Sequence, residues 1–180
     1  MNNEVIKYRG AALTDVKAIA EKFIGHIRSN PETITSADIA SGFALSRDSV
    51  PRDAIAIYER HLSAILDNEE DPVIVAECEG RIIGFLVLRI EGYGGPLCGM
   101  LDEFLVLPEY RGQGIGKSML TMAIDILRSE GIRTLLCSAG CKNDFAHEFL
   151  PRNGFQVVSQ SYHLIINEPD EFPFPENNEE

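Results

Sequence analysis

The sequence contains no tryptophan, only four cysteines and no long apolar run. No window approaches the roughly 18 apolar residues of a membrane span, and residues 1–7 lack the apolar stretch of a signal peptide. We therefore expect no membrane association and a cytoplasmic location. The cysteines Cys78, Cys98, Cys137 and Cys141 form no C-x-x-C pair and have no suitably spaced histidine, so the sequence predicts no metal site.

Basic residues are scarce as well, because 16 Lys and Arg stand against 28 Asp and Glu, for a net charge of −12. Phosphate contacts supply most nucleic-acid affinity, so we expect no nucleic-acid partner. Residues 168–180 hold six of the acids and three prolines without any Lys or Arg, which predicts an acidic C-terminal tail. The remaining residues, 1–167, are predicted to form one domain, since a chain of this size supports a single core.

Apolar periodicity predicts alternating strands and helices, and therefore an α/β fold. The expected strands are residues 5–9, 73–77, 81–90, 99–106, 134–138, 155–158 and 162–166, with a hairpin turn at Glu79-Gly80. The expected helices are residues 14–26 with Thr14 as N-cap, 51–67, 115 to about 131, and 144–150. Residues 28–50 are irregular, and a short helix over 36–44 is an additional option.

Residues 105–118 join an apolar strand to an amphipathic helix through a glycine-rich turn. Glycine lets the backbone approach a ligand closely and adopt positive φ without a Cβ clash. The first N–H groups of the following helix have no intrahelical partner and carry the positive end of the helix dipole. The turn is therefore predicted to bind a pyrophosphate, with Arg111 or Lys117 adding charge. The alternative is a glycine-rich turn without a ligand.

Two common phosphate motifs do not fit this turn. A Walker A loop has four residues between its first glycine and the final Gly-Lys-Ser, whereas three separate Gly112 from Gly116. The dinucleotide fingerprint G-x-G-x-x-G fails because Met119 stands where its third glycine belongs. Because the spacing does not match a Walker A loop, the sequence disfavours a nucleoside triphosphatase.

The pattern that remains, Arg-x-x-Gly-x-Gly on Arg111, Gly114 and Gly116, resembles the coenzyme A pyrophosphate loop of the GNAT superfamily of acyl-CoA-dependent N-acyltransferases. A downstream segment is similar to the family's Asn-x-x-Ala-x-x-Phe-Tyr-x-x-x-Gly-Phe through Asn143, Ala146, Phe149 and residues 153–155. The likeness covers about residues 73–166, and residues 5–67 only in the order of elements. It implies a GNAT-type α/β fold, with a mixed, mostly antiparallel sheet of about seven strands flanked by about four helices.

The resemblance also implies acetyl-CoA as the acyl donor and indicates its contacts. In the family, strand amides run alongside the pantetheine arm, the turn holds the pyrophosphate, and the asparagine at the Asn143 position bonds the arm. Asn143 could instead be only a helix cap. The residues expected to bind the cofactor are Phe104, Leu105, Val106, Arg111, Gly112, Gln113, Gly114, Ile115, Gly116, Lys117, Ser118 and Asn143.

One position departs from the family pattern. The tyrosine that often protonates the departing thiolate would fall at Leu150, which has no proton to donate. Another donor could serve, with Tyr162, Cys141 or Ser138 as candidates. Alternatively, the thiolate leaves unassisted, since a thiol with a pKa near 8.5 is a tolerable leaving group.

Glu103 is the expected catalytic base, because an amine with a pKa near 10.4 is almost fully protonated at neutral pH. It lies on the strand before the turn, where many members of the resembled family carry a carboxylate that faces the acceptor. Strand alternation predicts that Asp102 and Glu103 point to opposite faces, so that only one reaches the cleft. The alternative for Glu103 is a structural salt bridge.

The sequence thus predicts an N-acetyltransferase that moves an acetyl group from acetyl-CoA to a primary amine in a ternary complex. A small amine is favoured, because residues 101–106 look like those of diamine N-acetyltransferases. The alternatives are an acetyltransferase that acts on a protein lysine or N-terminus, and a CoA-binding sensor module without catalysis. We expect a monomer or a homodimer.

Overall fold

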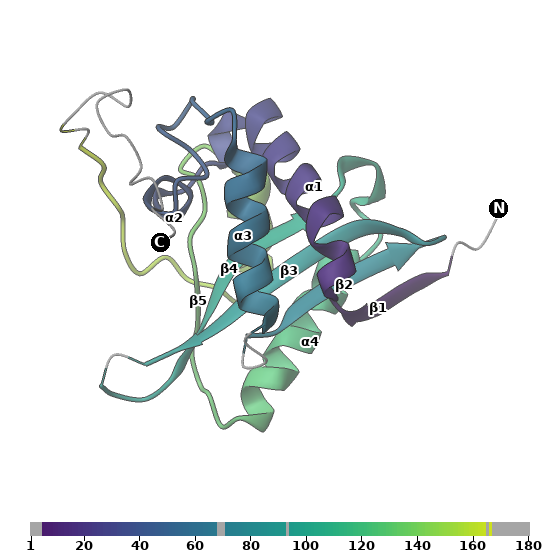
Figure 1. Cartoon of the computed structure of the whole chain (residues 1–180). Helices are drawn as coiled ribbons and strands as arrows, with labels where there is room; N and C mark the ends of the chain where they lie inside the picture. The colour runs from purple at the N-terminus through teal and green to yellow at the C-terminus, as the bar shows by residue number, and fades with distance from the viewer. Residues whose placement is uncertain (1–4, 68–70, 93, 165, 167–180) are drawn as a thin grey trace, which may run out of the picture.

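The computed structural model describes residues 5–67, 71–92, 94–164 and 166. Its centre is a five-stranded sheet in the order β1-β2-β3-β4-β5 (Figure 1). The strands are β1 (Ile6–Gly10), β2 (Val73–Cys78), β3 (Arg81–Glu91), β4 (Cys98–Val106) and β5 (Leu135–Cys137). The pairs β1–β2, β2–β3 and β3–β4 are antiparallel, and β4–β5 is parallel.

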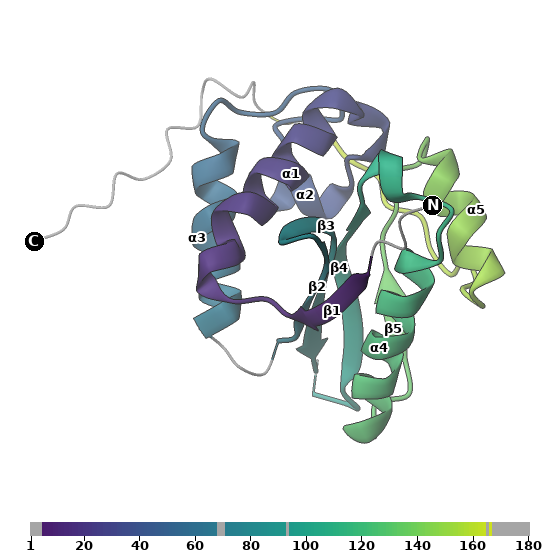
Figure 2. The same cartoon turned by 90° about the vertical axis from the view of Figure 1, so that its right-hand side faces the viewer.

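Helices cover both faces of the sheet. They are α1 (Val16–Ser29), α2 (Ser36–Ala40), α3 (Ala54–Asp67), α4 (Ile115–Ser129) and α5 (Asp144–Arg152). Figure 2 shows the sheet edge-on, with α1, α2 and α3 on one side and α4 and α5 on the other. Each side has its own apolar cluster, one built around Ile24, Tyr58 and Phe85, the other around Leu86, Met119 and Ala123. The apolar stripes on α1 and α4 account for these two layers.

The predicted α/β fold with a mixed, mostly antiparallel sheet is confirmed, but the predicted number of strands is wrong. Residues 155–158, 162–164 and 166 form no strand, and residue 165 lies outside the described part. Val157, Tyr162 and Leu164 are at least 79% exposed, as is Val158. Apolar runs favour strands only where a neighbouring strand and a buried face are available to them.

Most predicted elements are present with small shifts at their ends. The hairpin turns at Glu79 and Gly80, both of which have positive φ (49° and 74°), as expected for such a tight turn. The predicted N-cap Thr14 lies inside a short 3-10 turn over Leu13–Asp15, and α1 begins only after it. The optional helix over residues 36–44 is present as the shorter α2, which is followed by Gly42 at φ 75°.

The predicted acidic tail, residues 168–180, lies outside the described part of the chain. Within the described ranges, no helix combines the length and apolar character needed to cross a bilayer. The same ranges contain no group of three or more His, Cys, Asp or Glu placed to hold a metal ion.

Candidate active site

The predicted phosphate turn connects β4 to α4 through a 3-10 turn over Pro108–Tyr110. Gly112 and Gly114 have φ values of 76° and 80°, and a Cβ at either position would meet open space. Glycine is required here by the backbone, because other residues are strained at such φ values. The N–H of Ser118 donates to the carbonyl of Gly114 at 3.0 Å, so the helical ladder begins there. The preceding amides of residues 115–117 have no carbonyl of their own helix to bond.

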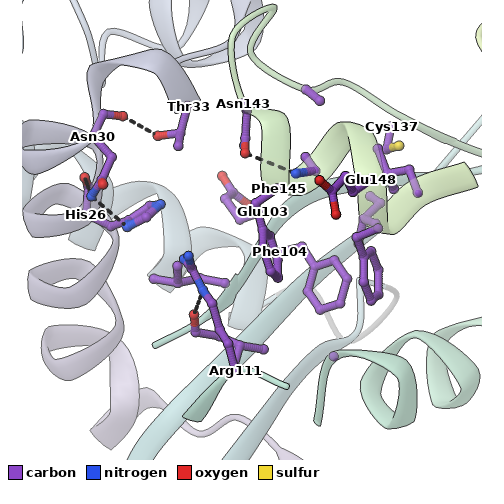
Figure 3. A pocket seen from close by; sticks show the side chains of 18 of the residues that line it. His26, Asn30, Thr33, Glu103, Phe104, Arg111, Cys137, Asn143, Phe145 and Glu148 are labelled. Carbon is purple, nitrogen blue, oxygen red and sulfur yellow. Dashed lines mark hydrogen bonds between the residues drawn. The ribbon is translucent and has the colours of Figure 1, made fainter. Parts of the chain in front are cut away.

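The N-terminal end of α4 opens into a cleft of about 630 Å³. Its walls come from the end of α1 and the segment after it, from β4, from the phosphate turn, and from β5 to α5 (Figure 3). The backbone of Gly140 lies directly against the backbones of Glu32 and Thr33. Two segments far apart in the sequence therefore meet beside this cleft, and no side chain larger than glycine's fits at the contact.

The cleft brings most of the predicted cofactor residues together. Ten of the twelve line it: Phe104, Leu105, Val106, Arg111, Gly112, Gly114, Ile115, Gly116, Lys117 and Asn143. Gln113 and Ser118 are not among the lining residues. The side chain of Gln113 is exposed, and the amide of Ser118 is used within α4.

Arg111 contacts two other residues of the cleft wall, Val106 and Phe145. Its Nε donates to the carbonyl oxygen of Val106 at 3.0 Å, and its guanidinium lies 4.6 Å from the ring centroid of Phe145. Partial burial lowers the pKa of Arg111. Figure 3 shows His26 close by on α1, and burial, followed by the charge of Arg111, lowers the pKa of this imidazole. The charge of Arg111 therefore favours the neutral form of His26.

Val106 is a β4 residue whose backbone polar groups face away from β3. The N–H of Leu107 donates to the carbonyl of Ile83 on β3 at 2.9 Å and is therefore occupied. The N–H and C=O of one residue in an antiparallel strand point to the same side, and this side alternates along the strand. The Val106 carbonyl already faces away from β3, toward Arg111. The Val106 N–H therefore points away from β3 too.

The expectation that only one of Asp102 and Glu103 reaches the cleft is wrong, because both line it. In the pairing of β3 with β4, Val87 is opposite Glu103, and the next residue, Leu88, is opposite Leu101. Asp102 is therefore the extra residue of a β-bulge, which interrupts strict alternation and redirects side chains. Asp102 forms an ion pair with Arg89, which also pairs with Glu91.

Glu103 is buried, with 6% of its surface exposed, and its Oε2 has no hydrogen-bond partner among the described residues. Burial, followed by the charges of Asp102 and Asp38, raises the pKa of this carboxyl well above its usual value. The structural salt bridge considered for Glu103 is absent from the ion pairs of the described residues. Such a carboxyl is a stronger base than an exposed one.

Asn143 caps α5, since its Oδ1 accepts the N–H of Ala146 at 3.1 Å. This bond corresponds to the capping alternative for Asn143, yet the residue also lines the cleft. Capping occupies the oxygen only, and a neutral amide side chain also has two N–H donors. Both roles are therefore compatible at this position.

The structure separates the three candidate proton donors. Ser138 lines the cleft, as does Leu150. Tyr162 is 91% exposed and donates to Gln160 at 3.2 Å, while Cys141 is exposed and is not a lining residue. Cys137 was not expected in the site but lines it, and burial raises the pKa of its thiol.

Several further lining residues were not singled out by the sequence, namely His26, Asn30, Asp38 and Phe145. The region that holds the first three carries no recognised motif. One local signal was available for Asp38, since Thr35-x-x-Asp38 has the spacing of a capping box. In the structure, Thr35 donates from both N and Oγ1 to Asp38 Oδ2, each at 2.7 Å. That pattern predicts a helix start, not a place in a cleft.

A family model described as the acetyltransferase (GNAT) family matches residues 39–155. This range includes β4, the phosphate turn, Glu103 and Asn143. It begins after α1 and reaches the end of the described helices.

The chain is also similar to individual proteins. It is 27% identical over 101 residues to N-alpha-acetyltransferase 30 of Schizosaccharomyces pombe. That match covers 56% of this chain and 67% of the relative. It is 28% identical over 104 residues to aminoalkylphosphonate N-acetyltransferase of Salmonella typhimurium. That match covers 55% of this chain and 68% of the relative. Across the first four relatives, the match spans between 42% and 76% of the relative's own length.

Solved structures share the fold. A predicted acetyltransferase of Clostridium acetobutylicum, crystallised with acetyl-CoA, superimposes with a TM-score of 0.64 at 16% identity, covering 89% of this chain and 96% of that one.

Proposed function

The chain belongs to the acetyltransferase (GNAT) family and is an N-acetyltransferase, and we propose that it transfers the acetyl group of acetyl-CoA to a small primary amine. The observation that carries this proposal is the shared cleft, in which the glycine turn before α4 and the buried Glu103 carboxyl line one cavity of about 630 Å³. A diphosphate site and a strong base in one cavity suit acyl transfer from a CoA thioester to an amine.

Acetyl-CoA would bind with its pyrophosphate at the amides of residues 115–117 and the guanidinium of Arg111. Several N–H donors and the positive end of α4 would then act on the diphosphate together. The pantetheine arm would run along β4, where the Val106 backbone faces away from β3, and Asn143 would donate to it from the opposite wall. Arg111 would have to leave the Val106 carbonyl for the arm to bond there.

Glu103 would accept a proton from the ammonium group of the acceptor, directly or through one water. The neutral nitrogen then attacks the thioester carbonyl carbon, and the Val106 N–H stabilises the oxyanion. The C–S bond breaks, the thiolate leaves, and the nitrogen releases its second proton to solvent water, from which the thiolate is protonated. Holding both substrates in one cleft supplies much of the rate through proximity.

Ser138 is the candidate donor that fits this scheme best, because it lines the cleft whereas Tyr162 and Cys141 do not. The hydroxyl would hydrogen-bond the departing sulfur, and solvent would supply the proton. Cys137 offers a neutral thiol on the same wall.

The test is release of free thiol from acetyl-CoA in the presence of a panel of small amines and N-terminal peptides. We expect turnover with small amines and none without an acceptor. Turnover only with peptides would indicate a protein acceptor, which the similarity to an N-alpha-acetyltransferase supports as the second candidate. Tight acetyl-CoA binding in calorimetry without turnover of any acceptor would indicate a sensor module instead.

A further inference from the structure

Three acidic residues from α2 and β4 form part of the cleft wall. The carboxyls of Asp38, Asp102 and Glu103 line both the main cleft and a second cavity of about 90 Å³. Arg89 is the only Lys or Arg among the residues that line the second cavity. It already pairs with Asp102 and Glu91. Among the ion pairs of the described residues, Asp38 and Glu103 therefore have no basic partner.

Two of these carboxyls are buried in positions where a charge needs a partner. Glu103 Oε2 has no hydrogen bond among the described residues, and Figure 3 shows its carboxyl directed into the cleft. Asp38 is 8% exposed, and Thr35 holds its Oδ2 from two donors, which fixes the carboxyl at the start of α2. A buried carboxylate without a counter-charge is costly, so such a pair favours a cationic ligand.

The second cavity limits what that ligand can be. Apart from the three acids and Arg89, its walls are Ala37, Ser41, Phe43 and His61. A volume of about 90 Å³ has room for an ammonium group and its neighbouring methylene but not for a peptide. Because Asp38, Asp102 and Glu103 belong to both walls, the two cavities adjoin at these residues.

We propose that the acceptor is a small aliphatic diamine, and that its second ammonium group binds in this cavity against Asp38. This rests on the proposed function, in which Glu103 faces the amine that reacts. Glu103 serves the reacting nitrogen, while Asp38 selects acceptors by the charge at their other end. Asp38 thereby becomes a specificity-determining residue.

The test compares 1,4-diaminobutane with butylamine, which has the same chain length and one charge fewer. Thiol release is measured at saturating acetyl-CoA for the full chain, for Asp38→Asn and for the control Glu21→Gln, which removes one exposed acid on α1. The parent and the control should favour the diamine in kcat/KM by about tenfold or more. Asp38→Asn should lose that preference through a raised KM for the diamine, with butylamine turnover within about twofold of the parent.

Asparagine can still accept the Thr35 amide, so α2 should remain capped, and the melting temperature checks this. Equal use of both amines by the parent, or an equal loss for both in Asp38→Asn, overturns the proposal. So does a preference for a basic peptide over the diamine.

Failure of the proposed function is recognised separately. If no amine releases thiol, calorimetry of each amine against the CoA-loaded protein still decides the question. Tighter binding of 1,4-diaminobutane than of butylamine, lost in Asp38→Asn, supports the subsite. No diamine binding overturns it.

Discussion

Arg111 donates from Nε to the carbonyl oxygen of Val106 at 3.0 Å, which ties the phosphate turn back to the strand that precedes it. The proposed site thus combines two groups that a bound cofactor would use differently. The guanidinium suits the diphosphate, whereas the carbonyl suits an amide of the pantetheine arm. Cofactor binding should exchange this internal bond for contacts with the ligand.

The glycine turn gives the first prediction. Gly114→Val places a β-branched residue at φ 80°, which costs about 1–3 kcal/mol and displaces the amides that follow. Acetyl-CoA affinity measured by calorimetry should fall below detection while the fold is retained. The matched control is Gly131→Val at the other end of α4, where φ is 71° and the space is also open. It should lose similar stability but keep its affinity, and unchanged affinity in Gly114→Val would contradict the assignment of the turn.

The proposed base gives the second prediction. Glu103→Gln keeps the shape and removes the basicity, so turnover near pH 7 should drop on the order of 10²- to 10⁴-fold. The loss should shrink as the pH rises toward the amine's own pKa, because the acceptor then arrives neutral. Acetyl-CoA affinity should barely change, and the exposed control Glu130→Gln should behave like the parent. Turnover within about threefold of the parent would exclude Glu103 as the base.

The same substitution should stabilise the protein. The native pKa of Glu103 is raised above its ordinary value of 4.5, so the native state holds this proton more tightly than the unfolded state does. The penalty for the buried charge is fully present above the native pKa and disappears as the pH falls toward 4.5. Glu103→Gln should therefore melt higher than the parent at pH 8, by on the order of 1–3 kcal/mol in stability. A difference that fails to narrow toward pH 5 would contradict this reasoning.

Ser138 gives a prediction about the leaving group. Ser138→Ala should lower turnover by about tenfold, less than the loss of a full general acid, because the thiolate is a tolerable leaving group. Tyr162→Phe and Cys141→Ala serve as controls outside the cleft and should leave turnover unchanged. If Tyr162→Phe alone impairs the enzyme, its exposed position here is not the one used in catalysis.

The acidic tail gives a prediction that depends on sequence alone. Deleting residues 167–180 should leave turnover with a small amine nearly unchanged, since these residues carry six acids, three prolines and no basic side chain. Steady-state kinetics and a melting curve of the shortened chain check this. A large fall in melting temperature would mean that Phe172 or Phe174 packs against the domain or a second copy.

The sequence determined the local parts of this protein. Gly112 and Gly114 stand where the backbone needs positive φ, and Glu79-Gly80 closes the hairpin, because turn conformation is set by neighbouring residues. The apolar stripe on α4 and the strand before the turn were readable for the same reason. Ten of the twelve predicted cofactor residues line one cleft because they lie on one continuous strand-turn-helix segment and on the start of α5.

Only the tertiary structure decided which distant side chains meet. The bulge at Asp102 depends on the register between β3 and β4, which strand alternation within one segment cannot reveal. Asp38 enters the site because α2 and β4 both line the cleft, whereas its own sequence signals only a helix start. The apolar residues after Phe155 were expected to form strands, but a strand needs a partner edge, and residues 155–164 have none in this fold. Local chemistry thus set the turn, while long-range packing decided what surrounds Glu103.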